Sequence, residues 1–73
     1  MERLGEKLRS LRLRRGLSLR ELASILEVNS YSHLAEVESG KSKLSVEMLI
    51  KLADFYAVST DQLLRDHLEI DES

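Results

Sequence analysis

The chain has 73 residues, of which 33% are charged and 42% hydrophobic, with a formal net charge of −2. A chain of this length forms one small domain with a single core. It contains no cysteine, which excludes disulfides and thiolate metal sites. No apolar run reaches the ~20 residues that a membrane span needs. The N-terminus lacks the layout of a signal peptide, so a cytoplasmic protein without membrane association is expected.

Charge is unevenly distributed along the chain. Residues 1–20 hold seven basic and two acidic residues, whereas residues 52–73 hold six acidic residues and one arginine. A smaller basic island contains Lys41 and Lys43. Because local charge governs the choice of partner, this pattern predicts one positive face and one negative end. A merely solvated helix surface is the alternative interpretation of each charged run.

The first part of the chain predicts two helices. Both show apolar residues at helical spacing: Leu4, Leu8, Leu11, and then Leu19, Leu22, Ala23 and Leu26. A glycine stop at Gly16 follows a basic last turn and ends the first helix, over residues 2–15. The capping-box spacing of Ser18 and Glu21 begins the second helix, which ends near Leu26.

A third helix is predicted after a brief polar connection. Either Asn29 or Ser30 caps it, because a short side-chain oxygen can accept an N–H group of the first turn. It covers residues 31–39 and ends at Gly40.

Two more helices follow. Ser45 caps the fourth, whose apolar stripe ends at Tyr56. Ser59 and Gln62 repeat the capping-box spacing before a fifth helix that carries Leu63, Leu64 and Leu68. No segment alternates in the manner of a strand. The sequence therefore predicts an all-α, compact five-helix bundle, as one domain over residues 1–70 with a frayed acidic tail at 71–73.

The second and third helices are short and closely spaced, which favours a crossed helix-turn-helix arrangement. On the third helix, Leu34 and Val37 point one way and a polar face points the other. Such a face can enter the major groove of DNA and reach base edges. The same pattern also describes an ordinary surface helix.

From Leu4 to Leu64 the chain resembles the lambda-repressor-like helix-turn-helix domains, also called the Cro-type or xenobiotic-response-element family. The matching stretches are LGEKLRSLRLRRGLS, ELASIL, EVESGKSKLS, LIKLADFYAVS and DQLL. The resemblance implies a five-helix bundle that binds double-stranded operator DNA as a homodimer, with its third helix in the major groove.

The resemblance also implies roles for individual residues. The residues at or beside the base-reading positions are Ser30, Tyr31, Ser32, His33 and Glu36. The expected phosphate contacts are Arg12, Ser18, Arg20, Ser39, Lys41 and Lys43. Arg12 and Glu38 match a structural pair of the family. The expected dimer patch near the C-terminus consists of Phe55, Leu64, Leu68 and Ile70. Leu64 could instead complete the core of the monomer.

The chain departs from the family pattern at several positions. Leu19 replaces the usual glutamine at the start of the second helix, and Arg20 is the candidate substitute. Glu27 and Ala57 stand where the family has glycines. The turn is one residue longer than the common form, which can shift the base-reading register by one. The third helix has no Lys or Arg, although arginine to guanine is the commonest specific contact.

These observations predict a DNA-binding transcriptional regulator, of repressor type, and not an enzyme. The alternatives are a protein-interaction module such as an antitoxin, whose partner is a protein, and a restriction–modification controller that can also activate. An isolated domain of a longer regulator is a further alternative. No cofactor is expected, and no metal, because His33 and His67 are far apart without acids at ligand spacing.

Overall fold

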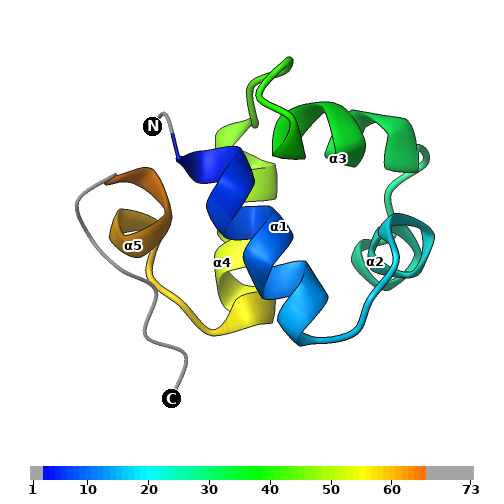
Figure 1. Cartoon of the computed structure of the whole chain (residues 1–73), viewed down its shortest axis with the longest axis horizontal. Helices are drawn as coiled ribbons and strands as arrows, with labels where there is room; N and C mark the ends of the chain where they lie inside the picture. Colours follow the sequence, from blue (N-terminus) through cyan, green and yellow to red (C-terminus); the bar gives the residue numbers. More distant parts are fainter. Residues whose placement is uncertain (1–2, 66–73) are drawn as a thin grey trace.

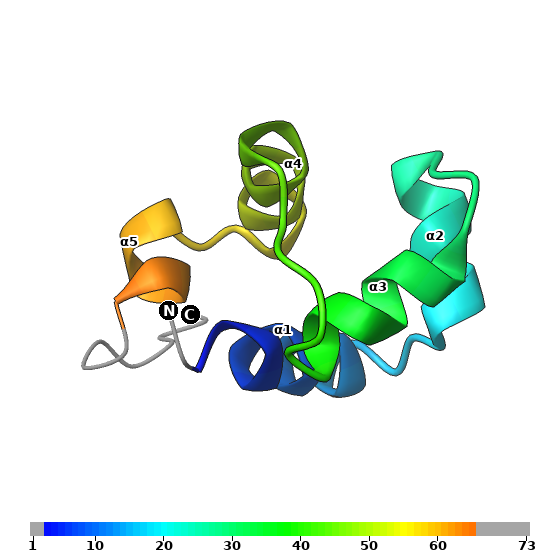
Figure 2. The ribbon, with the colours of Figure 1, turned by 90° about the horizontal axis from the view of Figure 1, so that it is seen from above.

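The computed structural model describes residues 3–65, which form five α-helices and no strand. The helices are α1 (Leu4–Arg14), α2 (Leu19–Leu26), α3 (Tyr31–Glu38), α4 (Val46–Tyr56) and α5 (Thr60–Leu64). In Figure 1, α1 crosses the middle of the molecule in front of α4, with α5 on one side and α2 and α3 on the other. Figure 2 shows the same arrangement from above. The predicted all-α bundle is confirmed.

One hydrophobic core joins the five helices. Its most deeply buried side chains come from four of them: Leu11, Leu22, Leu52, Tyr56 and Leu63. The apolar stripes predicted from helical spacing supply most of the rest, including Leu4, Leu8, Leu26, Leu34 and Val37. Helical periodicity was sufficient to identify this core because each helix buries a single face.

Serine hydroxyls begin four of the five helices: Ser18, Ser30, Ser45 and Ser59. Each accepts a backbone N–H of the first turn, which would otherwise lack a partner. In α2 and α5 the capping box is complete. Glu21 accepts the N–H of Ser18 at 3.0 Å, and Gln62 accepts that of Ser59 at 2.9 Å. All of the predicted helix starts from α2 onward are confirmed, with Ser30 rather than Asn29 as the cap of α3.

Two helices end on a left-handed residue that is not glycine. Glu27 follows α2 with φ of 58°, and Ala57 follows α4 with φ of 57°. Both stand at the positions where the resembling family has glycine. The left-handed conformation is unfavourable by about 1–2 kcal/mol for a residue with a Cβ. The bundle forms despite these two strained ends.

The fifth helix is short, with five residues. It ends at Leu64, and Arg65 is extended with ψ of 116°. The physical reason lies in α1. The ammonium group of Lys7 donates to the carbonyls of Gln62 and Arg65, both at 2.6 Å, and so closes the end of the helix. Leu68, Ile70, His67 and the predicted tail lie outside the described residues.

Candidate nucleic-acid interface

The helix-turn-helix unit consists of α2, a short turn at residues 27–30, and α3. The two helices contact each other and cross rather than running side by side (Figures 1 and 2). Leu34 and Val37 are each 3% exposed and fix the inner side of α3 in the core, together with Leu22 of α2. The predicted orientation of the two helices is therefore confirmed.

The opposite side of α3 faces solvent. Tyr31, Ser32, His33 and Glu36 are all exposed, and so is Ser30 at the N-cap. All five predicted base-reading residues are therefore accessible to a partner, at the N-cap and along α3. Their side chains offer hydroxyl, imidazole and carboxylate groups, all of which can pair with base edges. The hydroxyl of Ser30 is already used as a cap, since it accepts the N–H of Ser32 at 3.2 Å.

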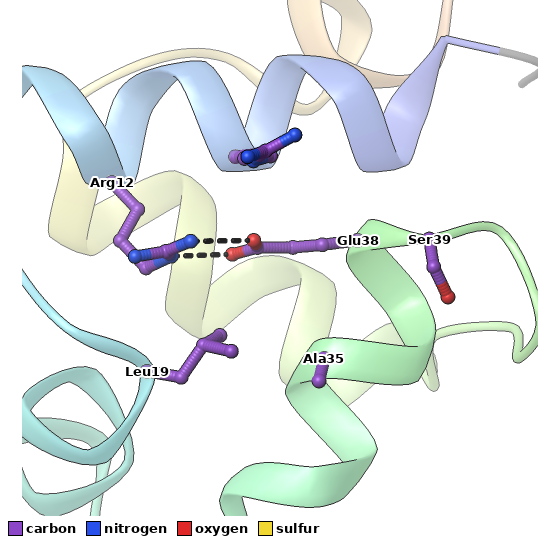
Figure 3. A pocket seen from close by; sticks show the side chains of 6 residues that line it. Arg12, Leu19, Ala35, Glu38 and Ser39 are labelled. Atoms are coloured by element: carbon purple, nitrogen blue, oxygen red, sulfur yellow. Dashed lines mark hydrogen bonds and ion pairs between the residues drawn. The ribbon is translucent and has the colours of Figure 1, made fainter.

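A bidentate ion pair attaches α3 to α1. Arg12 Nε and Nη2 donate to the two carboxylate oxygens of Glu38 at 2.9 and 3.1 Å, as the two dashed lines in Figure 3 show. Arg12 Nη1 also donates to the carbonyl of Leu17 at 2.7 Å. The two charged side chains are only 11% and 8% exposed. The hydrogen bond to Glu38 raises the pKa of Arg12 above its usual value.

The backbones of α1 and α3 also approach each other closely at Gly5. A Cβ at this position would lie 2.6 Å from the carbonyl oxygen of Val37 and closer still to that of Glu38. Only glycine therefore fits here. Gly5 and Arg12 together fix the C-terminal end of α3 relative to α1, and thereby the direction in which its outer face points.

The residues expected at phosphates flank α3. Lys41 and Lys43 are exposed just beyond its C-terminal end, and Ser39 lies exposed at that end. The hydroxyl of Ser39 donates to the carbonyl of Glu36 at 3.0 Å. Ser18 is exposed at the start of α2. Arg12 differs from the others because it is buried and three of its N–H groups are already engaged.

An open hollow of about 290 Å³ lies where α1, α2 and α3 meet (Figure 3). It is lined by Arg9, Arg12, Leu19, Ala35, Glu38 and Ser39. Two of the expected phosphate residues, Arg12 and Ser39, therefore share one site. The sequence analysis did not single out Arg9, although it is one turn before Leu13 and Arg12 on the same helix. Its charge alone could not identify it, because the sequence does not show which basic side chains of α1 are exposed beside α3.

A comparison with known families gives a direct match. The family model described as a helix-turn-helix domain covers residues 3–68 of the chain. The chain belongs to the helix-turn-helix domain family. It is also similar to a protein named HTH-type transcriptional regulator DdrOP3 from Deinococcus deserti, with 37% identity over 62 residues. That alignment includes 85% of this chain and 47% of the relative, so the domain spans about half the length of this curated relative.

Two basic residues of α1 in this helix-turn-helix domain are buried, and a third reaches back to α4. Lys7 is only 3% exposed, and Arg12 is 9% exposed. Arg15 donates to the carbonyl of Tyr56 at 3.3 Å, at the end of α4. The three side chains thus reach the C-terminal ends of α5, α3 and α4, where the helix dipole favours a positive charge. The prediction that the basic segment forms one positive face is therefore wrong for Lys7 and Arg12, which are buried.

Arg20 is placed differently from these three. It extends from α2 toward the first residue of α3, where its guanidinium carbon lies 5.1 Å from the ring centroid of Tyr31. Its Nη2 donates to the Tyr31 hydroxyl at 3.3 Å, which raises the pKa of Arg20. Both side chains are exposed. The sequence analysis identified both residues but not their contact, because helical spacing within one helix carries no information on pairs between helices.

Two of the four residues expected in the dimer patch lie within the described part of the chain. Phe55 and Leu64 are half-buried and pack against the core of their own domain. The Phe55 ring lies edge-on to Tyr56, with centroids 5.0 Å apart, and Arg15 lies 5.5 Å from its centroid. Leu68 and Ile70 are outside the described residues.

Within residues 3–65, no group of three His, Asp or Glu side chains is arranged to hold a metal ion. None of the helices in this part of the chain combines the length and the apolar character needed to cross a bilayer.

Proposed function

We propose that this domain belongs to a transcriptional regulator that binds double-stranded DNA, with α3 in the major groove. The observation that carries the proposal is that α3 has one buried apolar side and one exposed polar side. Leu34 and Val37 fix its inner side in the core, while Tyr31, Ser32 and Glu36 are exposed and can meet base edges. Membership of the helix-turn-helix family and the printed name of the similar Deinococcus protein support the same function.

Phosphate contacts are proposed at both ends of this reading surface. Lys41 and Lys43 supply point charges beyond the end of α3. Arg9 and Ser39 line the hollow beside α1, where Arg9 would supply the cation for a phosphate oxygen and Ser39 could turn its hydroxyl from the Glu36 carbonyl to the phosphate. Ser18 lies at the start of α2, where helix N–H groups favour an anion. Arg12 is proposed to act mainly by orienting α3, because its guanidinium is engaged with Glu38 and Leu17.

We further propose a homodimer that binds a palindromic operator and represses by excluding the polymerase. In such a dimer the two recognition helices lie about 34 Å apart, one turn of DNA. Phe55 and Leu64 both retain exposed surface, which supports a partner surface on the α4–α5 side. A second hollow, of about 440 Å³, lies beside Phe55 between α2 and α4.

The decisive experiment is selection from randomised duplex DNA at ~0.15 M salt, where weak non-specific attraction is screened. Enrichment of a palindrome with half-sites one helical turn apart is the expected result. A folded protein that enriches no sequence would contradict the proposal.

A pair of variants tests the assigned orientation. Lys43→Ala should weaken binding to every duplex and reduce the slope of log affinity against log salt by about one. Lys51→Ala removes the same charge from α4 and should leave the slope unchanged. Equal effects of both variants would mean that α3 does not face the DNA.

A protein-interaction module is the second candidate function. It is favoured by the charge of the exposed side of α3, which carries Glu36 and no Lys or Arg. This candidate predicts that the protein enriches no DNA sequence alone and that a basic partner protein protects Glu36 from carboxyl-modifying reagents.

A further inference from the structure

The recognition helix of this protein lacks the side chain that most often reads DNA. Residues Tyr31–Glu38 include no arginine or lysine, whereas arginine bound to guanine is the commonest specific contact in the major groove. A guanidinium is nevertheless present at the N-terminal end of α3. It belongs to Arg20 of α2, which lies over the ring of Tyr31.

We propose that Arg20, held by Tyr31, reads a guanine in each half-site, so that the two side chains act as one base-reading unit. The proposal rests on the proposed function and assigns a base contact to a residue outside α3. In helix-turn-helix proteins the N-terminal residues of the recognition helix are those that contact base edges. Tyr31 is the first residue of α3, and it brings Arg20 to that end of the helix.

The geometry leaves the guanidinium able to bind a base. The guanidinium carbon lies over the Tyr31 ring, 5.1 Å from the ring centroid. One N–H, on Nη2, is used by the Tyr31 hydroxyl at 3.3 Å. A guanidinium has five N–H groups in a planar fork, so four remain, and a pair of them can bind the O6 and N7 acceptors of guanine.

Stacking on Tyr31 also favours recognition for an entropic reason. A free arginine side chain has many rotamers, and ordering them on binding reduces affinity. A guanidinium that is already stacked on an aromatic ring loses less freedom when it meets its base. Tyr31 is therefore a positioning residue for Arg20, in addition to any contact of its own.

A phosphate contact by Arg20 is the competing assignment, and the two make opposite predictions. A phosphate contact depends on charge and carries no sequence information, whereas a bidentate guanine contact depends on the planar fork. Arg20→Lys preserves the charge and removes the fork. This substitution therefore separates the two assignments without altering the net charge of the domain.

The test is the DNA selection experiment repeated with Arg20→Lys, followed by binding measurements over a range of salt. The expected result is a loss of about tenfold in preference for guanine at one symmetric position, with an unchanged salt slope. The matched control is Arg14→Lys, an exposed residue at the end of α1, which should select the same sequence as the wild type. Circular dichroism should show that both variants are folded.

Tyr31 is tested by two substitutions of its own. Tyr31→Phe keeps the ring and removes only the hydroxyl. It should therefore reduce the guanine preference only a few-fold, which is less than the loss expected for Arg20→Lys. Tyr31→Leu removes the ring as well. If the pair acts as a unit, the effects of Tyr31→Leu and Arg20→Lys on guanine preference should be strongly non-additive in the double variant.

Three results would overturn the inference. If Arg20→Lys selects the wild-type sequence while Arg20→Ala weakens binding to all duplexes equally, Arg20 binds phosphate. If the Tyr31 and Arg20 effects simply add, Tyr31 does not position Arg20. If the wild-type protein enriches no sequence at all, the proposed function itself fails and this inference fails with it.

Discussion

Arg12 and Lys7 both extend from α1 to the C-terminal end of another helix, but they meet different partners. Arg12 binds the Glu38 carboxylate of α3 through two hydrogen bonds and reaches the Leu17 carbonyl with a third. Lys7 binds two neutral carbonyls, those of Gln62 and Arg65, at the end of α5. The α1–α3 junction is thus held by a pair of opposite charges. The α1–α5 junction is held by one ammonium group that donates to two carbonyl dipoles.

This difference between a charged and a neutral partner indicates which junction depends on both of its members. Removing either member of a buried charge pair leaves the other charged and without compensation, which is strongly destabilising. A carbonyl at the end of a helix can instead be hydrated once its ammonium partner is gone. The α1–α3 junction, which orients the proposed reading helix, is therefore expected to be the more sensitive of the two.

Glu38→Ala should produce the largest effect on stability. It leaves the Arg12 guanidinium buried without its carboxylate, and a loss of about 3 kcal/mol in the free energy of unfolding is expected. Urea titration followed by circular dichroism measures it. The control is Asp61→Ala, which breaks the exposed pair with Arg65 at 3.6 Å, where the side chains are 69% and 61% exposed. That loss should stay below about 1 kcal/mol.

A double variant separates pairing from burial at the same junction. Arg12→Met combined with Glu38→Leu removes both charges and keeps apolar volume, so it should recover most of the stability that Glu38→Ala loses. A double variant as unstable as the single one would show that the pair itself, rather than an uncompensated charge, stabilises this junction.

Gly5→Ala tests the close approach of α1 and α3 independently of charge. The added methyl group would collide with the carbonyl oxygens of Val37 and Glu38, so the helices must separate. A loss of about 2 kcal/mol is expected, although alanine is the better helix former. Glu6→Ala, on the exposed side of the same helix, should change stability by less than about 0.5 kcal/mol. Equal thermal unfolding temperatures for the two variants would contradict this reading of the contact.

Lys7→Met addresses the α5 junction. It keeps the apolar stem and removes the ammonium, so the carbonyls of Gln62 and Arg65 lose a charged donor. A loss of about 1.5 kcal/mol is expected, smaller than that of Glu38→Ala. Arg9→Met, an exposed position on the same helix, is the control. If Lys7→Met were as destabilising as Glu38→Ala, the proposed difference between the two junctions would be wrong.

Glu27→Gly and Ala57→Gly should have the smallest effects, and both should stabilise. Each residue has a left-handed φ that glycine adopts without strain. Because glycine also makes the unfolded chain more flexible, the net gain is about 0.5–1 kcal/mol at each site. The reverse substitution, Gly40→Ala at φ of 84°, should destabilise by a similar amount. Differential scanning calorimetry of the three variants measures these changes in stability. A lower stability of Glu27→Gly or Ala57→Gly than of the wild type would contradict the prediction.

The local parts of this structure could be predicted from the order of the residues alone. Serine caps at Ser18, Ser45 and Ser59 specified where helices begin, because capping involves only the residues of the first turn. Apolar spacing specified which face of each helix is buried. The family resemblance also supplied one long-range contact, between Arg12 and Glu38, which the structure contains.

Whether a basic side chain of α1 is buried or exposed depends on the tertiary structure. A charge count cannot distinguish Lys7, buried at the end of α5, from Arg9, exposed beside α3, because that depends on which helix packs against each side of α1. The end of α5 and the stacking of Arg20 on Tyr31 have the same origin. Each is a contact between segments distant in sequence, and neither periodicity nor capping within one helix encodes such a contact.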